Sequence, residues 1–335
     1  MIDKRTVFVL GAGASCPYGF PSGAHLRERI CLSTNRPSLP DLATASGKEK
    51  DISEFRRKFE NSSTRSIDLF MARNPALAPT GKWVIAFEVL TAEGESQFRE
   101  RAAQTQYAQL HSEYSTYLSR KDFQGDDWYL PLFNRLIQGL LGRDDLPDFS
   151  DGKVAFITFN YDRSLEYFLY ESVRNSFTEV PQSEVIQCLK NLRILHVYGQ
   201  VAPLKWQDPN EGVDYRPQIT KSLLQTAAKN IKTIYEEKES AELTEAHELL
   251  QRAERIFFLG FGYAAENMDV LKLPESIPLG CKVYGTAFNM EPMEVEHIRH
   301  TVHFGRKRDR PNAYMSPGYT IVEPCDCLML LRRYL

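Results

Sequence analysis

Five short runs of aliphatic, aromatic and β-branched residues constrain the fold of this chain most strongly. Each run is followed by glycine, asparagine or a polar turn, and the five cover residues 6–10, 154–159, 193–197, 255–259 and 282–284. Their apolar character is nearly continuous rather than alternating, which is typical of strands covered on both faces. We therefore expect an α/β fold with a Rossmann-like parallel sheet and helices on both faces.

The sequence between these runs predicts helices, the clearest of which cover residues 96–118, 128–141, 164–173 and 241–255. The last two follow or precede a predicted strand, as the crossover of a βαβ unit requires. Residues 37–151 contain few strand signals and much helical pattern. We expect one α/β domain over residues 1–335 with a mainly helical insertion at about 37–151.

Charge and cysteine content exclude several classes of protein. The 41 basic and 44 acidic side chains give a net charge of -3, which predicts neither nucleic-acid binding nor attachment to an anionic membrane. No apolar stretch reaches the roughly 18 to 20 residues of a membrane span, and the run at 7–10 is too short for an export signal. The six cysteines fit no disulfide framework, so we expect reduced thiols in a cytoplasmic protein. Cys325 and Cys327 form a lone C-x-C pair, so no metal is expected.

A glycine-containing turn follows the first predicted strand. Gly11, Gly13 and Ser15 stand where a backbone can turn sharply and present free amides to a phosphate group. A buried strand with a tight turn remains the alternative, because short glycine motifs are weak signals. The third glycine and the downstream acid of a dehydrogenase are missing, and so is the Gly-Lys-Ser/Thr ending of a P-loop.

Four motifs in order, "GAGASCPYGFPSG", "TFNYD", "HVYG" and "FLGFGYAAEN", resemble the sirtuin-like family, specifically the bacterial sirtuin-like NAD hydrolases of antiphage defence systems. The resemblance covers the sheet regions, about half of the chain. It implies an NAD+ glycohydrolase that cleaves NAD+ to nicotinamide and ADP-ribose as an abortive-infection effector. It also implies a homo-oligomer, or activation by a partner such as a HerA-type ATPase.

The resemblance also implies which residues form the site. Asn160 and His196 would be catalytic, and the residues that would bind NAD+ are Gly11, Ala12, Gly13, Ser15, Phe20, Asp162, Tyr198, Gly260, Gly262, Asn267 and Thr286. The segment "RSIDLFM" at 65–71 is similar to one in the defence relatives, without an assigned role for Asp68.

The chemistry of glycosidic cleavage agrees with these residue types. Nicotinamide leaves as a neutral group from a cationic precursor, so the enzyme must stabilise an oxocarbenium-like ribose and deliver water to it. Asn160 can hold the water, and His196 can accept its proton because an imidazole titrates near neutrality. Sirtuin deacetylases place their histidine immediately before the glycine, where this chain has Tyr198. Residues i and i+2 of a strand share a face, so His196 could still reach the site.

Structural alternatives remain for several of these residues. His196 could be bonded within the end of the sheet, Asn160 or Asp162 could cap the next helix, and the turn at Gly260 could be a simple connection. Two other functions also remain, a non-catalytic sensor of NAD or ADP-ribose and a protein deacylase. The deacylase is disfavoured by Phe159, where deacetylases have glutamine, and by the absence of a four-cysteine zinc ribbon. We expect the helical insertion, around 85–120, to form the oligomer or partner interface.

Overall fold

Six parallel strands form the sheet of this protein. The computed structural model describes residues 2–32, 48–96, 126–140, 142, 145–233, 236, 240–304 and 319–335. The strands are β1 (Thr6–Leu10), β2 (Val154–Thr158), β3 (Arg193–His196), β4 (Arg255–Leu259), β5 (Lys282–Thr286) and β6 (Thr320–Glu323). Their order is β3-β2-β1-β4-β5-β6 and every neighbouring pair is parallel. This is the Rossmann order, and it confirms the expected fold class.

The centre of the sheet explains the continuous apolar runs. All five side chains of β1 are buried, because helices cover both faces of the central strands. Phe8 of β1 lies beside Phe156 of β2 and Phe257 of β4 in the ladder. Its ring stacks on both neighbours, with centroid distances of 5.1 and 5.4 Å. Each ring removed from water contributes about 1.5–3 kcal/mol to stability.

Between β1 and β2 the described residues form helices and loops, without a strand. After the short turns η1 (Ala12–Ala14) and η2 (Cys16–Tyr18) come α1 (Gly23–Leu32), α3 (Glu49–Glu60), α4 (Ile67–Arg73), η3 (Pro75–Leu77), α5 (Ala78–Glu95) and α7 (Tyr129–Leu136). The helix predicted at 128–141 is shorter than expected, since the chain turns at Gly139 with a φ of 91°. From residue 97 on, the helix predicted at 96–118 lies outside the described residues. Residues 85–90 of α5 are all buried, and the interface expected around 85–120 stays a prediction.

The remaining helices connect the other strands. They are α8 (Ser164–Ser176), α9 (Gln182–Lys190), α10 (Lys221–Asn230), α11 (Ala241–Arg252), α12 (Ala265–Val270), α13 (Pro292–Phe304) and α14 (Cys327–Tyr334). α8 and α11 match two predicted helices, although α11 ends at Arg252 because Ala253 is extended and leads into β4. In the described part of the chain, no helix is both long and apolar enough to cross a membrane.

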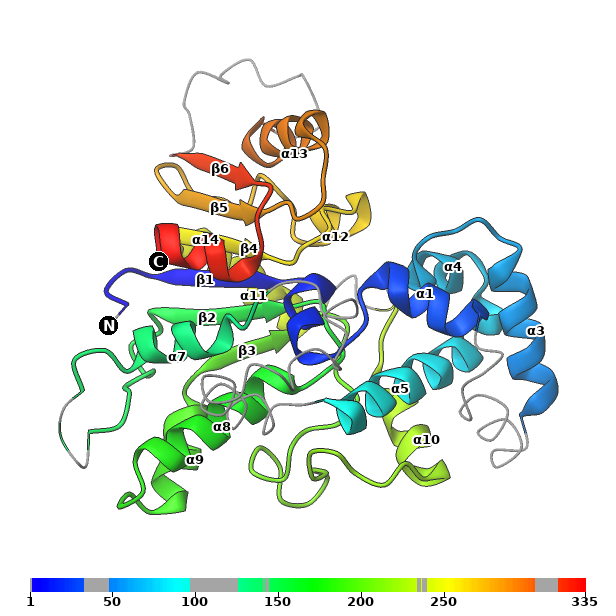
Figure 1. Ribbon diagram of the computed structural model, residues 1–335, viewed down its shortest axis with the longest axis horizontal. Helices are drawn as coiled ribbons and strands as arrows, with labels where there is room; N and C mark the ends of the chain where they lie inside the picture. Colours follow the sequence, from blue (N-terminus) through cyan, green and yellow to red (C-terminus); the bar gives the residue numbers. More distant parts are fainter. Residues whose placement is uncertain are drawn as a thin grey trace, which may run out of the picture.

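Helices lie on both faces of the sheet and also beyond one of its edges. In Figure 1, α7 and α14 cover the near face while α11 passes behind. The group formed by α1, α3, α4, α5 and α10 lies beyond the carboxyl ends of the strands (Figure 1). Within this group Phe55 and Phe59 of α3 pack against Phe70 of α4, with centroid distances of 5.5 and 4.9 Å. These helices therefore cover the carboxyl edge of the sheet, where the loops after β1, β2 and β4 meet.

Candidate functional site

A cavity of about 730 Å³ lies at the carboxyl ends of β1, β2 and β4. Strand order reverses between β1 and β4, and open α/β sheets bind their ligands at this position. We call it the sheet-edge cavity. Eleven of the residues predicted from the sequence line it, namely Gly11, Ala12, Gly13, Phe20, Asn160, Asp162, Tyr198, Gly260, Gly262, Asn267 and Thr286. Ser15 and His196 do not belong to the lining.

The glycines after β1 and β4 allow these two loops to touch each other. A Cβ atom on Gly11 would lie 2.6 Å from the carbonyl oxygen of Gly260, and one on Gly13 would lie 2.9 Å from the same oxygen. Gly260 has a φ of 55°, and a Cβ atom there would lie 2.0 Å from the amide nitrogen of Ala14. The loops are closer than any side chain allows, so these three positions require glycine for packing.

Most amides of the first loop are already paired, which differs from the expected phosphate cradle. Gly11 N donates to Leu259 O and Gly13 N to Gly260 O, each at 3.0 Å. The amides of Ala14 and Ser15 donate to carbonyls within the same loop. Among the described residues, the Ala12 amide alone in this loop has no hydrogen-bond acceptor. The loop therefore lines the cavity but offers a bound group only one free N–H.

Asn160 follows β2 and carries an unpaired acceptor. Its Nδ2 donates to the Gly11 carbonyl at 3.0 Å and to Ser15 Oγ at 2.9 Å, which fixes the orientation of the amide. Its Oδ1 is buried and has no hydrogen-bond partner in the described part of the chain. A buried acceptor without a donor costs about 1–3 kcal/mol, which a ligand or a water molecule in the cavity would recover. Ser15 thus acts behind the lining, as a support for Asn160.

Two carboxyl groups, the buried Asp162 and the half-buried Asp68, line the same cavity. Asp162 Oδ1 accepts the Ser164 amide at 3.1 Å and the Ser164 hydroxyl, so it satisfies the first amide of α8, whose N-cap residue is Arg163. Asp68 on α4 accepts the hydroxyl of Tyr161 at 2.5 Å. Burial raises the pKa of both carboxyl groups, despite the hydrogen bonds that stabilise their charged forms. Both acids therefore hold a proton to higher pH than an exposed aspartate.

The structure does not bring His196 to the cavity as a base. Its Nδ1 lies 2.9 Å from the carbonyl oxygen of Asn160, and its Nε2 lies 2.6 Å from Glu166 Oε1. Both partners are acceptors, so the ring donates from both nitrogens and keeps no lone pair for a substrate proton. Burial opposes the charge, but the Glu166 carboxylate and the Asn160 carbonyl outweigh it and raise the pKa of His196. The alternative of a structural histidine fits this geometry.

His196 and Tyr198 do not share a strand face, as the sequence had suggested, because β3 ends at His196. The Gly199 amide donates to the His196 carbonyl at 3.1 Å, so residues 197–199 form a turn and not a strand. Positions i and i+2 share a face only within a strand. Tyr198 does line the cavity, where its hydroxyl donates to Asn267 Oδ1 at 3.0 Å. On the opposite side, Gly260 N donates to Thr286 Oγ1 at 2.8 Å.

Two arginines of the lining were missed by the sequence interpretation. The guanidinium of Arg27 donates to the carbonyls of Phe59, Glu60 and Thr64. Arg65 is exposed and has no hydrogen-bond or ion-pair partner among the residues the structure describes. Arg65 begins the motif "RSIDLFM", but only the packing of α4 over the sheet edge places its charge at the cavity.

All six cysteines are free thiols, and burial raises the pKa of Cys16 to about 12. The described residues contain no group of three or more His, Cys, Asp or Glu side chains that could hold a metal ion. No protein-family model matches the chain, and a comparison with curated proteins finds no significant similarity. What the structure and the comparisons establish is therefore the fold, an α/β architecture with a six-stranded parallel sheet.

Proposed function

We propose that this chain binds NAD+ in the sheet-edge cavity and hydrolyses it to nicotinamide and ADP-ribose. The observation that carries the proposal is the unpaired Oδ1 of Asn160, buried at the carboxyl end of β2. Asn160 is also the residue that is expected to be catalytic from the resemblance to the sirtuin-like NAD hydrolases of antiphage defence. An acceptor at this position can hold a water molecule against the ribose carbon from which nicotinamide departs.

The proton of that water needs an acceptor other than His196. Asp68 and Asp162 line the cavity, and the raised pKa of each brings it closer to the range in which a general base is efficient. Their negative charge also stabilises the positive charge that develops on the ribose. We therefore assign the polar chemistry of the site to Asn160 and these two carboxyl groups.

The pyrophosphate of NAD+ carries two negative charges, and the paired amides of the first loop leave little to neutralise them. Arg27 and Arg65 supply cations at the lining. Arg65 is the stronger candidate because its guanidinium is not used elsewhere in the described protein. A lone guanidinium can bind a phosphate group through two parallel hydrogen bonds.

One observation favours the second candidate, a sensor that binds NAD or ADP-ribose without cleaving it. The described lining contains no histidine, and His196 is occupied by Glu166 and by the Asn160 carbonyl. A sensor would need the cavity and its cations but no base. Turnover separates the two functions.

The test is NAD+ consumption by the purified protein at high concentration, with products resolved by chromatography. We expect nicotinamide and ADP-ribose from the parent chain and no products from Asn160→Ala. The matched control is Asn175→Ala, which removes an exposed asparagine on α8 far from the cavity lining. Binding of ADP-ribose without turnover, both alone and with the partner supplied, would establish the sensor, and the absence of both binding and turnover would refute both functions.

Control of such an activity belongs to the proposal, because unregulated loss of NAD+ would kill the host cell. We propose a cytoplasmic homo-oligomer, or a complex with a partner such as a HerA-type ATPase, as the active form. Analytical ultracentrifugation with and without NAD+ tests the first possibility. A monomer at every concentration that is nevertheless active would contradict it.

A further inference from the structure

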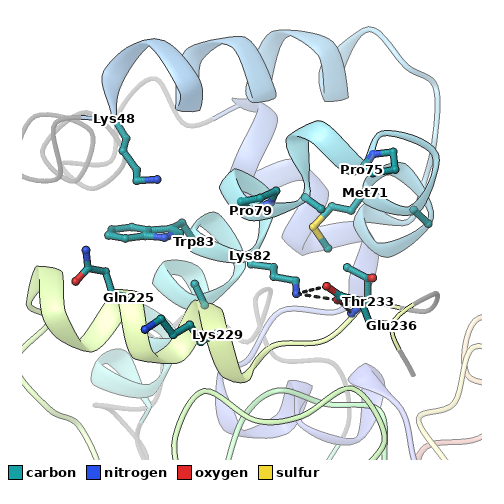
Figure 2. Close-up of a pocket in the computed structure, with 13 residues that line it drawn as sticks. Lys48, Met71, Pro75, Pro79, Lys82, Trp83, Gln225, Lys229, Thr233 and Glu236 are labelled. Atoms are coloured by element: carbon teal, nitrogen blue, oxygen red, sulfur yellow. Dashed lines mark hydrogen bonds and ion pairs between the residues drawn. The ribbon is translucent and has the colours of Figure 1, made fainter. Parts of the chain in front are cut away.

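A second cavity, of about 770 Å³, lies within the helical group beyond the sheet edge. Figure 2 shows its walls, which come from α4, η3 and α5 on one side and from α10 on the other. Its apolar surface is formed by Met71, Pro75, Pro79 and Trp83. It shares no lining residue with the sheet-edge cavity, so the proposed function leaves it unexplained.

The charge of this helical cavity is positive. Its described residues include three lysines and one carboxylate, a net charge of two positive units. Lys82 Nζ is paired with Glu236, at 2.9 and 2.7 Å from the two carboxylate oxygens. Lys48 Nζ lies 5.0 Å from the centre of the Trp83 ring. Lys229 has no hydrogen-bond or ion-pair partner in the described part of the protein, and Figure 2 shows it on the opposite side of the indole from Lys48.

The pairing within the lining leaves two ammonium groups uncompensated. Glu236 neutralises Lys82, which is only 14% exposed. Among the described lining residues neither Lys48 nor Lys229 has a carboxylate partner, and the Trp83 indole lies between the two lysines. A bound anion would neutralise the free ammonium group of Lys229. The described lining contains no arginine, so it lacks the planar fork that selects carboxylates, whereas lysine binds phosphate as a point charge.

We propose that the helical cavity is a binding site for a phosphorylated small molecule, whose phosphate pairs with Lys229 and whose ring contacts the apolar wall. The Trp83 indole and the Met71 thioether can pack on the flat face of a nucleobase or on the C–H groups of a sugar ring. A nucleoside monophosphate and a sugar phosphate both have this chemistry, and their binding affinities distinguish the two sources.

The same elements line both cavities, which provides a physical connection between them. α4 contributes Asp68 to the sheet-edge cavity and Met71 to the helical cavity. The chain that leaves α10 is tied to the first cavity, since Lys232 N donates to the Tyr198 carbonyl at 2.9 Å, and its next residue, Thr233, lines the second. A ligand that draws α5 and α10 together therefore acts on the position of Tyr198. This coupling rests on the proposed function, whereas the binding site itself does not.

Isothermal titration calorimetry at fixed ionic strength tests the site, with uridine monophosphate, ribose 5-phosphate and inorganic phosphate as the probes. We expect at least one of the two organic phosphates to bind more tightly than inorganic phosphate. Lys229→Glu should weaken that binding by about tenfold or more, because it places a carboxylate near the phosphate. The matched control is Lys221→Glu, the same charge change on the exposed start of α10, outside the lining. Lys229 is itself exposed, and thermal unfolding checks that both variants fold.

Three results would overturn the site: no binding of any probe, equal binding by the two variants, or inorganic phosphate binding as tightly as the organic phosphates. The coupling is tested separately, by the affinity for ADP-ribose with and without a saturating amount of the organic phosphate. Different affinities support the coupling and identical ones overturn it. If ADP-ribose does not bind at all, the proposed function has failed, and the calorimetry still decides the helical cavity.

Discussion

Glu93→Ala should destabilise this protein more than most single substitutions, because it breaks a fully buried ion pair. Glu93 of α5 accepts Arg163 Nε at 2.9 Å and Nη2 at 2.8 Å, and both side chains are 0% exposed. Glu93 also accepts the Arg216 amide at 2.7 Å. Arg163 connects this carboxylate to the carbonyls of Pro203, Val213 and Asp214. The substitution leaves a guanidinium buried without its counter-charge.

The expected loss is about 3–5 kcal/mol, the cost of removing one partner from a buried pair. The unpaired Arg216 amide adds to it, since an unmade buried hydrogen bond costs about 1–3 kcal/mol. Folded domains are stable by only about 5–15 kcal/mol, so the variant should lose a large share of its stability. Urea unfolding followed by circular dichroism measures the difference. Refolding from urea establishes that the transition is reversible.

Glu171→Ala is the matched control, because it removes the same side chain from a partly exposed pair. Glu171 lies 3.8 Å from Arg174 one turn along α8, and such pairs contribute about 0–1 kcal/mol. A double variant, Glu93→Leu with Arg163→Met, should recover part of the loss, because no charge is left buried. Recovery is incomplete, since three carbonyls lose their donor. If Glu93→Ala and Glu171→Ala cost the same, the argument from burial is refuted.

Three further predictions follow from contacts at the sheet edge. Gly260→Ala should destabilise the fold by several degrees in thermal unfolding, whereas Gly262→Ala, whose Cβ atom meets nothing within 4 Å, should be close to neutral; equal shifts would contradict the loop contact. His196 has a raised pKa when folded, so the stability it contributes is complete below its unfolded pKa of about 6.5 and is lost as the pH rises through the folded value. Urea unfolding at several pH values should therefore show that the cost of His196→Gln falls as the pH rises, and a cost that grows would disprove the assigned charge. Arg65→Ala should weaken ADP-ribose binding by about tenfold in calorimetry without changing the melting temperature, while an unchanged affinity would remove Arg65 from the phosphate site.

The sheet was largely predictable from the sequence because its strands are buried on both faces. A nearly continuous apolar run such as 255–259 is typical of a strand that is covered by helices on both faces. β6 was missed because Val322 is its only fully buried residue, so its four residues give no apolar run. Most of the predicted site residues do line the cavity, since the carboxyl ends of parallel strands converge on one edge and the motifs there follow the strands directly.

The hydrogen-bond partners of the side chains could not be predicted in the same way. His196 was expected to act on a substrate, but Glu166 of α8 is bonded to its Nε2. Nothing in the spacing of residues 166 and 196 indicates that contact. The helical cavity was missed for a related reason, because its lysines are far apart in sequence and lie near one cavity only through the packing of α5 against α3 and α10. Packing between helices depends on side-chain shape, which periodicity does not record.

The unpaired oxygen of Asn160 is better explained by a ligand than by loose packing, because every other polar group of that residue is held. Its Nδ2 is fixed by Gly11 and Ser15, its amide donates to Thr158 Oγ1 at 3.0 Å, and its carbonyl accepts from the ring of His196. The loop that supplies two of these contacts is in turn pressed against Gly260. A side chain held this firmly cannot turn to satisfy Oδ1 from within the protein. The contacts that hold Asn160 in the fold therefore also fix the orientation of its Oδ1 toward a ligand in the cavity.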